Sequence, residues 1–215
     1  MRAMDDSPVI ARSGGKTERT RARILHAARE LFANEHYDAV TTQRVSHAAG
    51  IAAGTLFRYA STKGELLLMV LNDRFAEAID EGIHDASAAP DAEGALWALA
   101  RPVLDFAGAQ GENTAHYQMA LLYGPSGEPY RDRGRELVGA WRDAVAERLS
   151  ATLGVPAGDP RLATAAEAAF AVLTLAVADL TQARRRDDLR EQLGLIARGI
   201  HTHSHPQQHP DEGMD

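Results

Sequence analysis

The sequence predicts an all-α protein, because apolar residues recur at helical spacing along most of the chain and no segment alternates like a strand. Prolines and glycines divide this pattern into pieces of helical length. Of the 215 residues, 45% are hydrophobic and 25% are charged, which is ordinary for a folded protein of this size. We therefore expect a small three-helix domain at the front and a larger helical domain behind it.

The front of the chain is expected to hold a flexible arm and a compact helical domain. The arm contains Gly14-Gly15 and has no periodicity. Thr41 is placed to cap the second helix, and Gly50 supplies its C-terminal stop. The expected segments are an arm over 1–16, a first domain over 17–63 with helices at about 17–33, 41–49 and 53–59, and a further helix from Lys63 with a cap at Ser61-Thr62.

The remainder, 64–202, is expected to be helical throughout, and a polar tail follows it. The expected helices run over about 90–107, 112–123, 128–153, 160–185 and 187–200. The His- and Pro-rich tail over 203–215 is expected to be disordered, with weak binding of a transition metal as the alternative.

Charge is divided unequally between the two expected domains. Residues 1–63 hold ten Lys and Arg against six Asp and Glu, a net charge of +4. The whole chain carries −7, so the remaining residues carry −11. A basic N-terminal segment followed by an acidic remainder is the charge distribution expected when only the N-terminal segment contacts a polyanion.

Several classes of protein are disfavoured by what the sequence lacks. No run of about 18 apolar residues is present, so no membrane span is expected, and the N-terminus does not resemble a secretory signal. The chain has no cysteine, which excludes disulfides and thiolate chemistry and fits a cytoplasmic protein. It carries no Gly-rich phosphate loop, HExxH or GxSxG motif, so we expect neither an enzyme nor a bound cofactor.

The stretch from Thr41 to Lys63 has the pattern of a helix-turn-helix. Two short helices flank Gly50, which permits the left-handed backbone of a sharp turn. Val45 and Leu56 can bury a small core between them. The second helix then presents hydroxyl, guanidinium and aromatic groups, of the kind that contact phosphates and base edges.

Over about 17–70 the sequence resembles the tetracycline-repressor (TetR) family, through Tyr37-Asp-Ala-Val-Thr-Thr, Ala48-Ala-Gly-Ile, Gly54-Thr-Leu-Phe-Arg-Tyr and Ser61-Thr-Lys-Gly-Glu-Leu. The resemblance implies a ligand-responsive repressor that releases a palindromic operator. It also implies a phosphate contact by Thr42, a base contact by Gln43 and a backbone contact by Lys63. The full set of expected DNA-binding residues is Thr42, Gln43, Arg44, Ala53, Thr55, Phe57, Arg58, Tyr59 and Lys63.

Three positions depart from the family pattern, and some of the same residues have simpler explanations. His36 stands where glycine is usual, so a left-handed backbone is expected there, while Phe57 and Ala60 replace a tyrosine and a phenylalanine. Thr41 can be only a helix cap, and Phe57 can be partly core. The arginines at 19, 21 and 23 suit either a solvated helix face or phosphate contacts.

The larger domain is expected to bind a second subunit and a small effector of unknown identity. The segments 128–153 and 160–185 are the best candidates for a dimer surface, and the resemblance implies a four-helix bundle. A scaffold protein without DNA binding is the alternative. The expected effector-binding residues are Trp97, Arg101, His116, Tyr117, Tyr123, Trp141 and Phe170.

Overall fold

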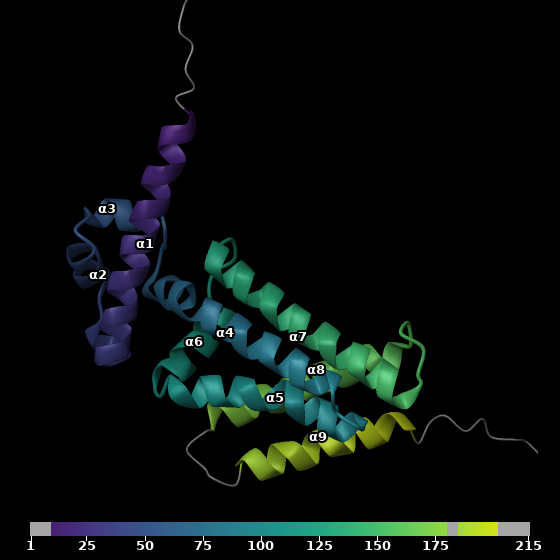
Figure 1. Cartoon of the computed structure of the whole chain (residues 1–215). Helices are drawn as coiled ribbons and strands as arrows, with labels where there is room; N and C mark the ends of the chain where they lie inside the picture. The colour runs from purple at the N-terminus through teal and green to yellow at the C-terminus, as the bar shows by residue number, and fades with distance from the viewer. Residues whose placement is uncertain (1–9, 180–184, 202–215) are drawn as a thin grey trace, which may run out of the picture. The chain divides into compact units, whose positions relative to one another are not determined.

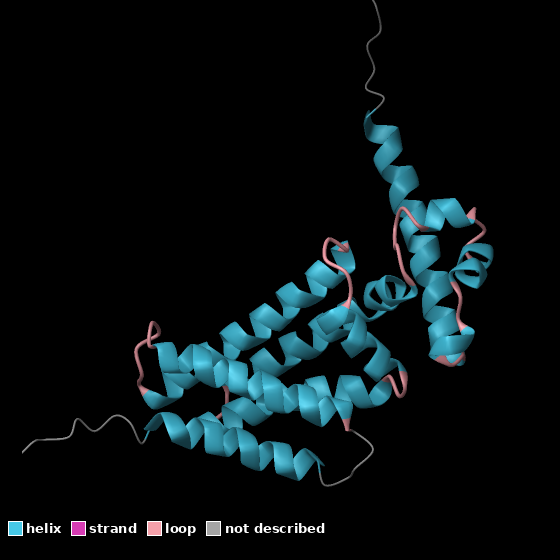
Figure 2. Ribbon diagram, turned by 180° about the vertical axis from the view of Figure 1, so that it is seen from behind, coloured by secondary structure: helices cyan, strands magenta, loops and turns pink. Residues whose placement is uncertain are grey.

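The computed structural model describes residues 10–179 and 185–201, which form helices joined by turns with no strand among them (Figures 1 and 2). The predicted all-α class is confirmed. In chain order the elements are α1 (Ile10–Asn34), the 3-10 helix η1 (Tyr37–Ala39), α2 (Thr42–Ala48), α3 (Ala53–Leu56), α4 (Lys63–Ser87), α5 (Ala92–Ala109), α6 (Asn113–Tyr123), α7 (Pro129–Leu153), α8 (Pro160–Ala178) and α9 (Arg185–His201).

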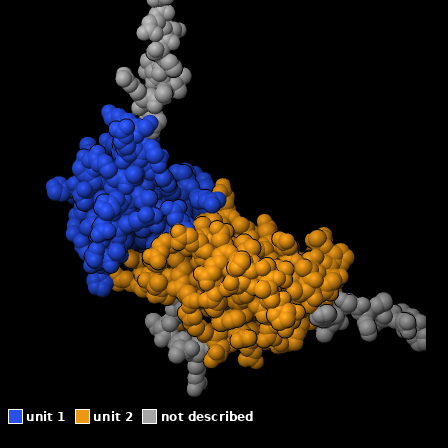
Figure 3. Space-filling view, viewed as in Figure 1, with its two compact units in different colours: residues 1–73, 115–134 blue, residues 74–114, 135–215 orange. Residues whose placement is uncertain are grey.

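The chain forms two compact units, coloured blue and orange in Figure 3. Unit 1 comprises residues 1–73 and 115–134, and unit 2 comprises residues 74–114 and 135–215. The sequence suggests a boundary near residue 63. Unit 1 extends past that point and also takes in residues 115–134, so α4, α6 and α7 each contribute residues to both units.

The first helix is longer than its apolar pattern predicts. It begins at Ile10, so the described part of the expected arm is helical, including Gly14-Gly15. Glycine disfavours a helix by about 1 kcal/mol relative to alanine. Adding residues to a helix that is already formed needs no new nucleus, so α1 extends across both glycines. The rest of the expected arm and the His-rich tail over 203–215 lie outside the described residues.

The core of unit 1 draws on its short helices and on the start of α4. Ile24 on α1, Val45 on α2, Leu56 on α3 and Leu66 on α4 have no exposed surface. Burial of each such side chain contributes about 1.5–3 kcal/mol. Helix α2 packs against both α1 and α3. This core fixes the relative orientation of the three helices that carry the expected site.

Unit 2 is built around α5, which packs against α8 and α9. Trp141 of α7 is almost fully buried there, and its Nε1 donates a hydrogen bond to the carbonyl oxygen of Leu99, 2.9 Å away. Helix α8 starts with Pro160 in its first turn after the cap residue Asp159. It ends at Ala178, before the expected residue 185.

Among the described residues, α8 alone is long and apolar enough, by length and composition, to cross a membrane, with a mean hydropathy of 1.5. No span was expected from the sequence, because α8 contains no unbroken apolar run of the required length. One such helix is weak evidence, since the core helix of a soluble protein has the same composition. Here α8 packs against α5 and α9.

Candidate nucleic-acid interface

Helix α1 supports the helix-turn-helix from behind. Ile24, Ala28 and Phe32 recur every four residues and are buried, so one face of the helix packs inward. On the same helix, Nη2 of Arg23 donates a hydrogen bond to the carbonyl oxygen of Gly50 over 2.8 Å. This bond ties the turn between α2 and α3 to α1.

Helix α2 begins as the sequence predicts. The Oγ1 of Thr41, whose backbone is extended, accepts a hydrogen bond from the backbone N–H of Arg44 at 3.2 Å. Val40, just before the cap, and Val45, four residues into the helix, are both fully buried, as a hydrophobic staple requires. The predicted cap at Thr41 is confirmed.

His36 is not left-handed, so that expectation was wrong. Its φ of −58° and ψ of 143° are ordinary extended values. A left-handed backbone costs a residue with a side chain roughly 1–2 kcal/mol. The chain avoids this cost with the unpredicted 3-10 helix Tyr37–Ala39, where the N–H of Ala39 donates to the carbonyl oxygen of His36 at 3.0 Å.

The turn between α2 and α3 depends on Gly50. Its φ of +61° lies in the left-handed region that the sequence predicts for it. The N–H of Gly50 donates to the carbonyl oxygen of His47 at 2.9 Å, and the next N–H, from Ile51, donates to that of Ser46 at 3.0 Å. A Cβ at position 50 would lie 2.7 Å from Nη2 of Arg23, so a side chain there would displace the Arg23 guanidinium.

Helix α3 is shorter than the expected 53–59. It ends at Leu56, and the backbone continues through a turn in which the N–H of Tyr59 donates to the carbonyl oxygen of Leu56 at 2.8 Å. Leu56 is fully buried, whereas 51% of Phe57 is exposed. Phe57 is therefore not a core residue, which removes the simpler of its two explanations.

All nine expected DNA-binding residues are exposed or half-buried. Gln43 and Arg44, with Leu31, His47 and Ala48, line a surface hollow of about 460 Å³. Exposed members of the set are Gln43, Arg44, Ala53, Phe57 and Arg58, and half-buried members are Thr42, Thr55, Tyr59 and Lys63.

Arg44 already has partners within the protein. Its Nη2 donates to Oε1 of Glu35 at 2.6 Å, its Nη1 donates to the carbonyl oxygen of Ala39 at 2.8 Å, and Nη1 also contacts Oε2 of Glu35. These hydrogen bonds lower the pKa of Glu35 below its ordinary value. Arg44 therefore braces the start of α2 against the end of α1, a role that its spacing in the sequence did not indicate.

Lys63 is also held within unit 1. Its Nζ donates to the carbonyl oxygen of Tyr37 at 2.9 Å and lies 3.9 Å from the centre of the Tyr37 ring. Tyr37 in turn stacks on His116 of α6, with ring centres 3.8 Å apart. Burial raises the pKa of Tyr37 above its ordinary value. In the sequence, Tyr37 belongs to the family pattern but has no role assigned to it.

The arginines at 19, 21 and 23 on α1 differ from one another in their contacts. Arg23 is bonded to Gly50, and Nε of Arg21 donates to the phenol oxygen of Tyr130 at 3.1 Å, with Tyr130 belonging to the same unit. Arg19 is exposed. Two of the three side chains therefore make contacts within unit 1.

The expected effector-binding residues are divided between the two units. His116, Tyr117 and Tyr123 belong to unit 1, where Tyr117 is buried and donates to Oδ1 of Asn72 at 2.9 Å. Burial raises the pKa of Tyr117 above its ordinary value. Tyr123 is strongly exposed.

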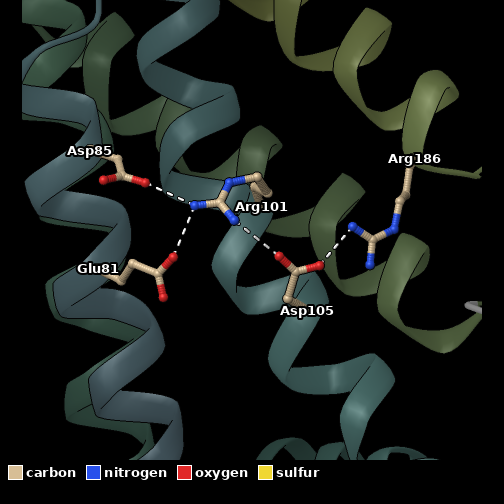
Figure 4. A network of polar contacts seen from close by, with 5 residues as sticks. All are labelled: Glu81, Asp85, Arg101, Asp105 and Arg186. Carbon is tan, nitrogen blue, oxygen red and sulfur yellow. Dashed lines mark hydrogen bonds and ion pairs between the residues drawn. The ribbon is translucent and has the colours of Figure 1, made fainter.

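The other four expected effector-binding residues belong to unit 2, where two of them are in ring contact. Trp141 and Phe170 contact each other with ring centres 6.3 Å apart. Trp97 lies under the guanidinium of Arg190. Arg101 is bound by the carboxylates of three acids in the network of Figure 4, namely Glu81 at 2.9 Å, Asp85 at 2.8 Å and Asp105 at 3.1 Å.

A comparison with family models places residues 24–70 in the family described as bacterial regulatory proteins, tetR family. A comparison with curated protein sequences found no match. The matched segment covers α1 from Ile24 through the first turns of α4, which is the region whose geometry is described above.

Solved structures with a similar fold are described as transcriptional regulators. A TetR transcriptional regulator from Rhodococcus sp. RHA1 is 18% identical, with a TM-score of 0.62 over 84% of this chain and 97% of that one. Thermus thermophilus FadR, a repressor in complex with lauroyl-CoA, is 23% identical, with a TM-score of 0.62 over 90% and 100%. Bacillus subtilis FadR, in complex with stearoyl-CoA, is 20% identical, with a TM-score of 0.58 over 84% and 99%. Residues 24–70, which contain the helix-turn-helix, therefore match the model of the tetR family of bacterial regulatory proteins, and the chain shares its all-helical fold with these regulators.

Proposed function

We propose that this protein is a cytoplasmic, homodimeric transcriptional repressor without enzymatic activity, which binds a palindromic operator and releases it when a small effector binds the domain over 64–202. The observation that carries the proposal is the exposed side of the segment after Gly50. Leu56 is fully buried there, while Phe57 and Arg58 face outward. Exposed aromatic and guanidinium groups on a firmly packed helix-turn-helix suit base and phosphate contacts.

In this proposal, Gln43, Thr55 and Tyr59 read the operator, and Thr42 and Lys63 hold its phosphates. The bond from Lys63 to Tyr37 does not exclude that role. An ammonium group has three donors, so two remain for phosphate oxygens.

The DNA contacts are tested by anisotropy with a duplex from the gene's own promoter. Affinity should fall steeply with salt, with a log–log slope of about −0.9 for each neutralised phosphate. Lys63→Ala should weaken binding to all duplexes equally and make the slope shallower by about 1, whereas Gln43→Ala should change the base preference. Arg135→Ala, an exposed change in unit 2, is the matched control and should leave the slope unchanged. A flat salt response would instead favour the scaffold alternative.

For the effector, we propose an amphiphile with a long apolar chain. The support is analogy, because two similar structures are described as complexes with lauroyl-CoA and stearoyl-CoA. The probes are these two thioesters, with free coenzyme A as the control. An effector that prefers the released state should dissociate the protein from DNA and raise its Tm. If neither thioester does so at saturating concentration, the effector belongs to another class.

For the dimer, we propose that α8 and α9 of two copies pack together. Each helix exposes a large apolar side chain, Leu175 at 56% and Leu195 at 58%. Exposed apolar side chains of this size are typical of a subunit interface when two helices present them together. Analytical ultracentrifugation should give a dimer for the native chain and a monomer for the double variant Leu175→Glu/Leu195→Glu. Ile83→Glu, an exposed apolar position on α4, should remain dimeric.

A further inference from the structure

Two buried carboxyl groups meet in unit 1, where α4 and α7 begin. Glu65 lies in the first turn of α4 and has no exposed surface, and Glu128, which directly precedes α7, is only 7% exposed. Oε1 of Glu128 accepts hydrogen bonds from the hydroxyls of Ser61 at 2.6 Å and Thr62 at 3.1 Å. Glu128 is therefore bonded to the segment that joins the helix-turn-helix to α4.

Glu65 makes the reciprocal contact. Its Oε1 accepts a hydrogen bond from the backbone N–H of Tyr130 at 2.7 Å. This N–H belongs to the first turn of α7, which has no partner for it within its own helix. Thr62 completes the arrangement, because its Oγ1 accepts from the backbone N–H of Glu65 at 3.0 Å. Each helix start is thus held by a carboxylate from the other segment.

One atom of this arrangement lacks a partner. Oε2 of Glu65 is buried and accepts no hydrogen bond. If both groups were ionised, this oxygen would lie unpaired beside a second buried negative charge, and both conditions are costly. A single proton removes both, because the two residues meet at Thr62, whose Oγ1 donates to Oε1 of Glu128 and accepts from the backbone N–H of Glu65. Burial and the nearby Glu128 raise the pKa of Glu65 to about 7, although the N–H bond from α7 acts in the opposite direction.

Three cationic side chains on these elements are bonded to other groups. Arg131 of α7 donates to the carbonyl oxygens of Leu121, Leu122 and Pro125, at 3.1, 3.0 and 3.2 Å. On α1, Arg21 is bonded to the Tyr130 phenol and Glu18, and on α4, Lys63 is bonded to Tyr37. Further titratable side chains on these elements include the exposed Asp132 and Arg133 of α7, Asp73 of α4, which is paired with Arg29, and His116 and Tyr117 of α6, which contact Tyr37 and Asn72.

We propose that Glu65 and Glu128 form a proton-dependent latch, in which one shared proton holds the first turn of α7 on the first turn of α4 and loss of that proton above neutral pH loosens the contact. Both helix starts belong to unit 1, so the latch acts on the unit that contains the helix-turn-helix. It requires neither DNA nor effector and therefore does not depend on the proposed function.

The test is hydrogen exchange of the full chain, followed on peptides that cover 61–66 and 128–134, between about pH 6 and about pH 8.5. The exchange rates are corrected for the intrinsic pH dependence of amide exchange. The protection factors of the Tyr130 and Arg131 amides should then fall about tenfold across this range, because a tenfold change corresponds to one unit of pKa. Glu65→Gln, which keeps a hydrogen-bond donor and removes the titration, should hold its protection constant. Glu147→Gln, an exposed change on α7, should respond like the native chain.

Infrared spectroscopy gives a second readout on the native chain, which needs no variant to fold. A protonated-carboxyl band should be present at about pH 6 and lost by about pH 8.5; Glu65→Gln should abolish that change, and Glu128→Gln should move it to lower pH. Constant protection in the native chain, or a pH response that persists in Glu65→Gln, would overturn the latch.

Discussion

Substitution of Gly50 by alanine tests the geometry of the helix-turn-helix most directly. The left-handed φ of +61° costs an alanine roughly 1–2 kcal/mol. The new Cβ would also lie 2.7 Å from Nη2 of Arg23 and displace it from its hydrogen bond to the Gly50 carbonyl. That bond is exposed, so its loss adds no more than about 1 kcal/mol. We expect Gly50→Ala to destabilise the helix-turn-helix by about 2 kcal/mol.

A double-mutant cycle separates the two contributions. In an Arg23→Ala background the displaced guanidinium is absent, so Gly50→Ala should then cost only the backbone term of about 1 kcal/mol. Gly54→Ala is the matched control, because Gly54 lies within α3, has no positive φ, and a Cβ added to it would meet no atom within 4 Å. Alanine at 54 should stabilise the domain by up to about 1 kcal/mol.

The assay must report on unit 1 alone, since a chain of two units need not unfold in one step. Exchange of the α2 amides between Val45 and Ala49 serves this purpose. Both tryptophans, Trp97 and Trp141, belong to unit 2, so their fluorescence midpoint in denaturant should remain unchanged and acts as an internal control. An unaltered exchange rate in Gly50→Ala, or the same loss in Gly54→Ala, would refute this account of the turn.

Three further outcomes follow from contacts in unit 2. Trp141→Phe removes the hydrogen bond to the Leu99 carbonyl and leaves unfilled volume, so calorimetry should show a loss of about 2–4 kcal/mol. Hydrogen bonding to Arg161 holds the pKa of Asp159 at about 2, below the ordinary pKa of 3.8. The ionised Asp159 therefore stabilises the folded chain at pH values above 3.8, and this stabilisation is lost as the pH falls towards 2. Circular dichroism should show that acid transition in the native chain and not in Asp159→Asn. Arg101→Met should cost about 1 kcal/mol in dilute buffer and clearly less in 0.5 M salt, whereas a salt-independent loss would contradict its ionic origin.

Local sequence chemistry was sufficient to predict the helix-turn-helix. The cap at Thr41 and the positive φ at Gly50 depend on residues within four positions, where side-chain type restricts the backbone directly. The periodic apolar pattern likewise located the starts of α4, α7 and α8 to within about one residue. Where local rules gave the wrong answer, at His36, the unpredicted 3-10 helix offered the chain a route of lower energy.

Long-range pairing could not be predicted in the same way. Tyr37 and His116 are far apart in sequence, and no pattern around either residue indicates that their rings stack. Glu65 and Glu128 are similar, because each looks like a solvated helix-start acid until the fold buries both. The partners of Arg44 were missed for the same reason, since a guanidinium on an expected recognition surface can equally reach Glu35 or a phosphate.

The surroundings of Arg101 bear on how an effector would be recognised. Its guanidinium is shared by Glu81, Asp85 and Asp105, and Asp105 is bonded in turn to Arg186 of α9 at 2.7 Å (Figure 4). An anionic effector group would have to displace carboxylates that already satisfy this charge, so it would gain little from Arg101. The network joins α4, α5 and α9, and any effector that shifts one of these helices must break some of its bonds. Arg101 is therefore better placed to resist such a shift than to bind the effector that causes it.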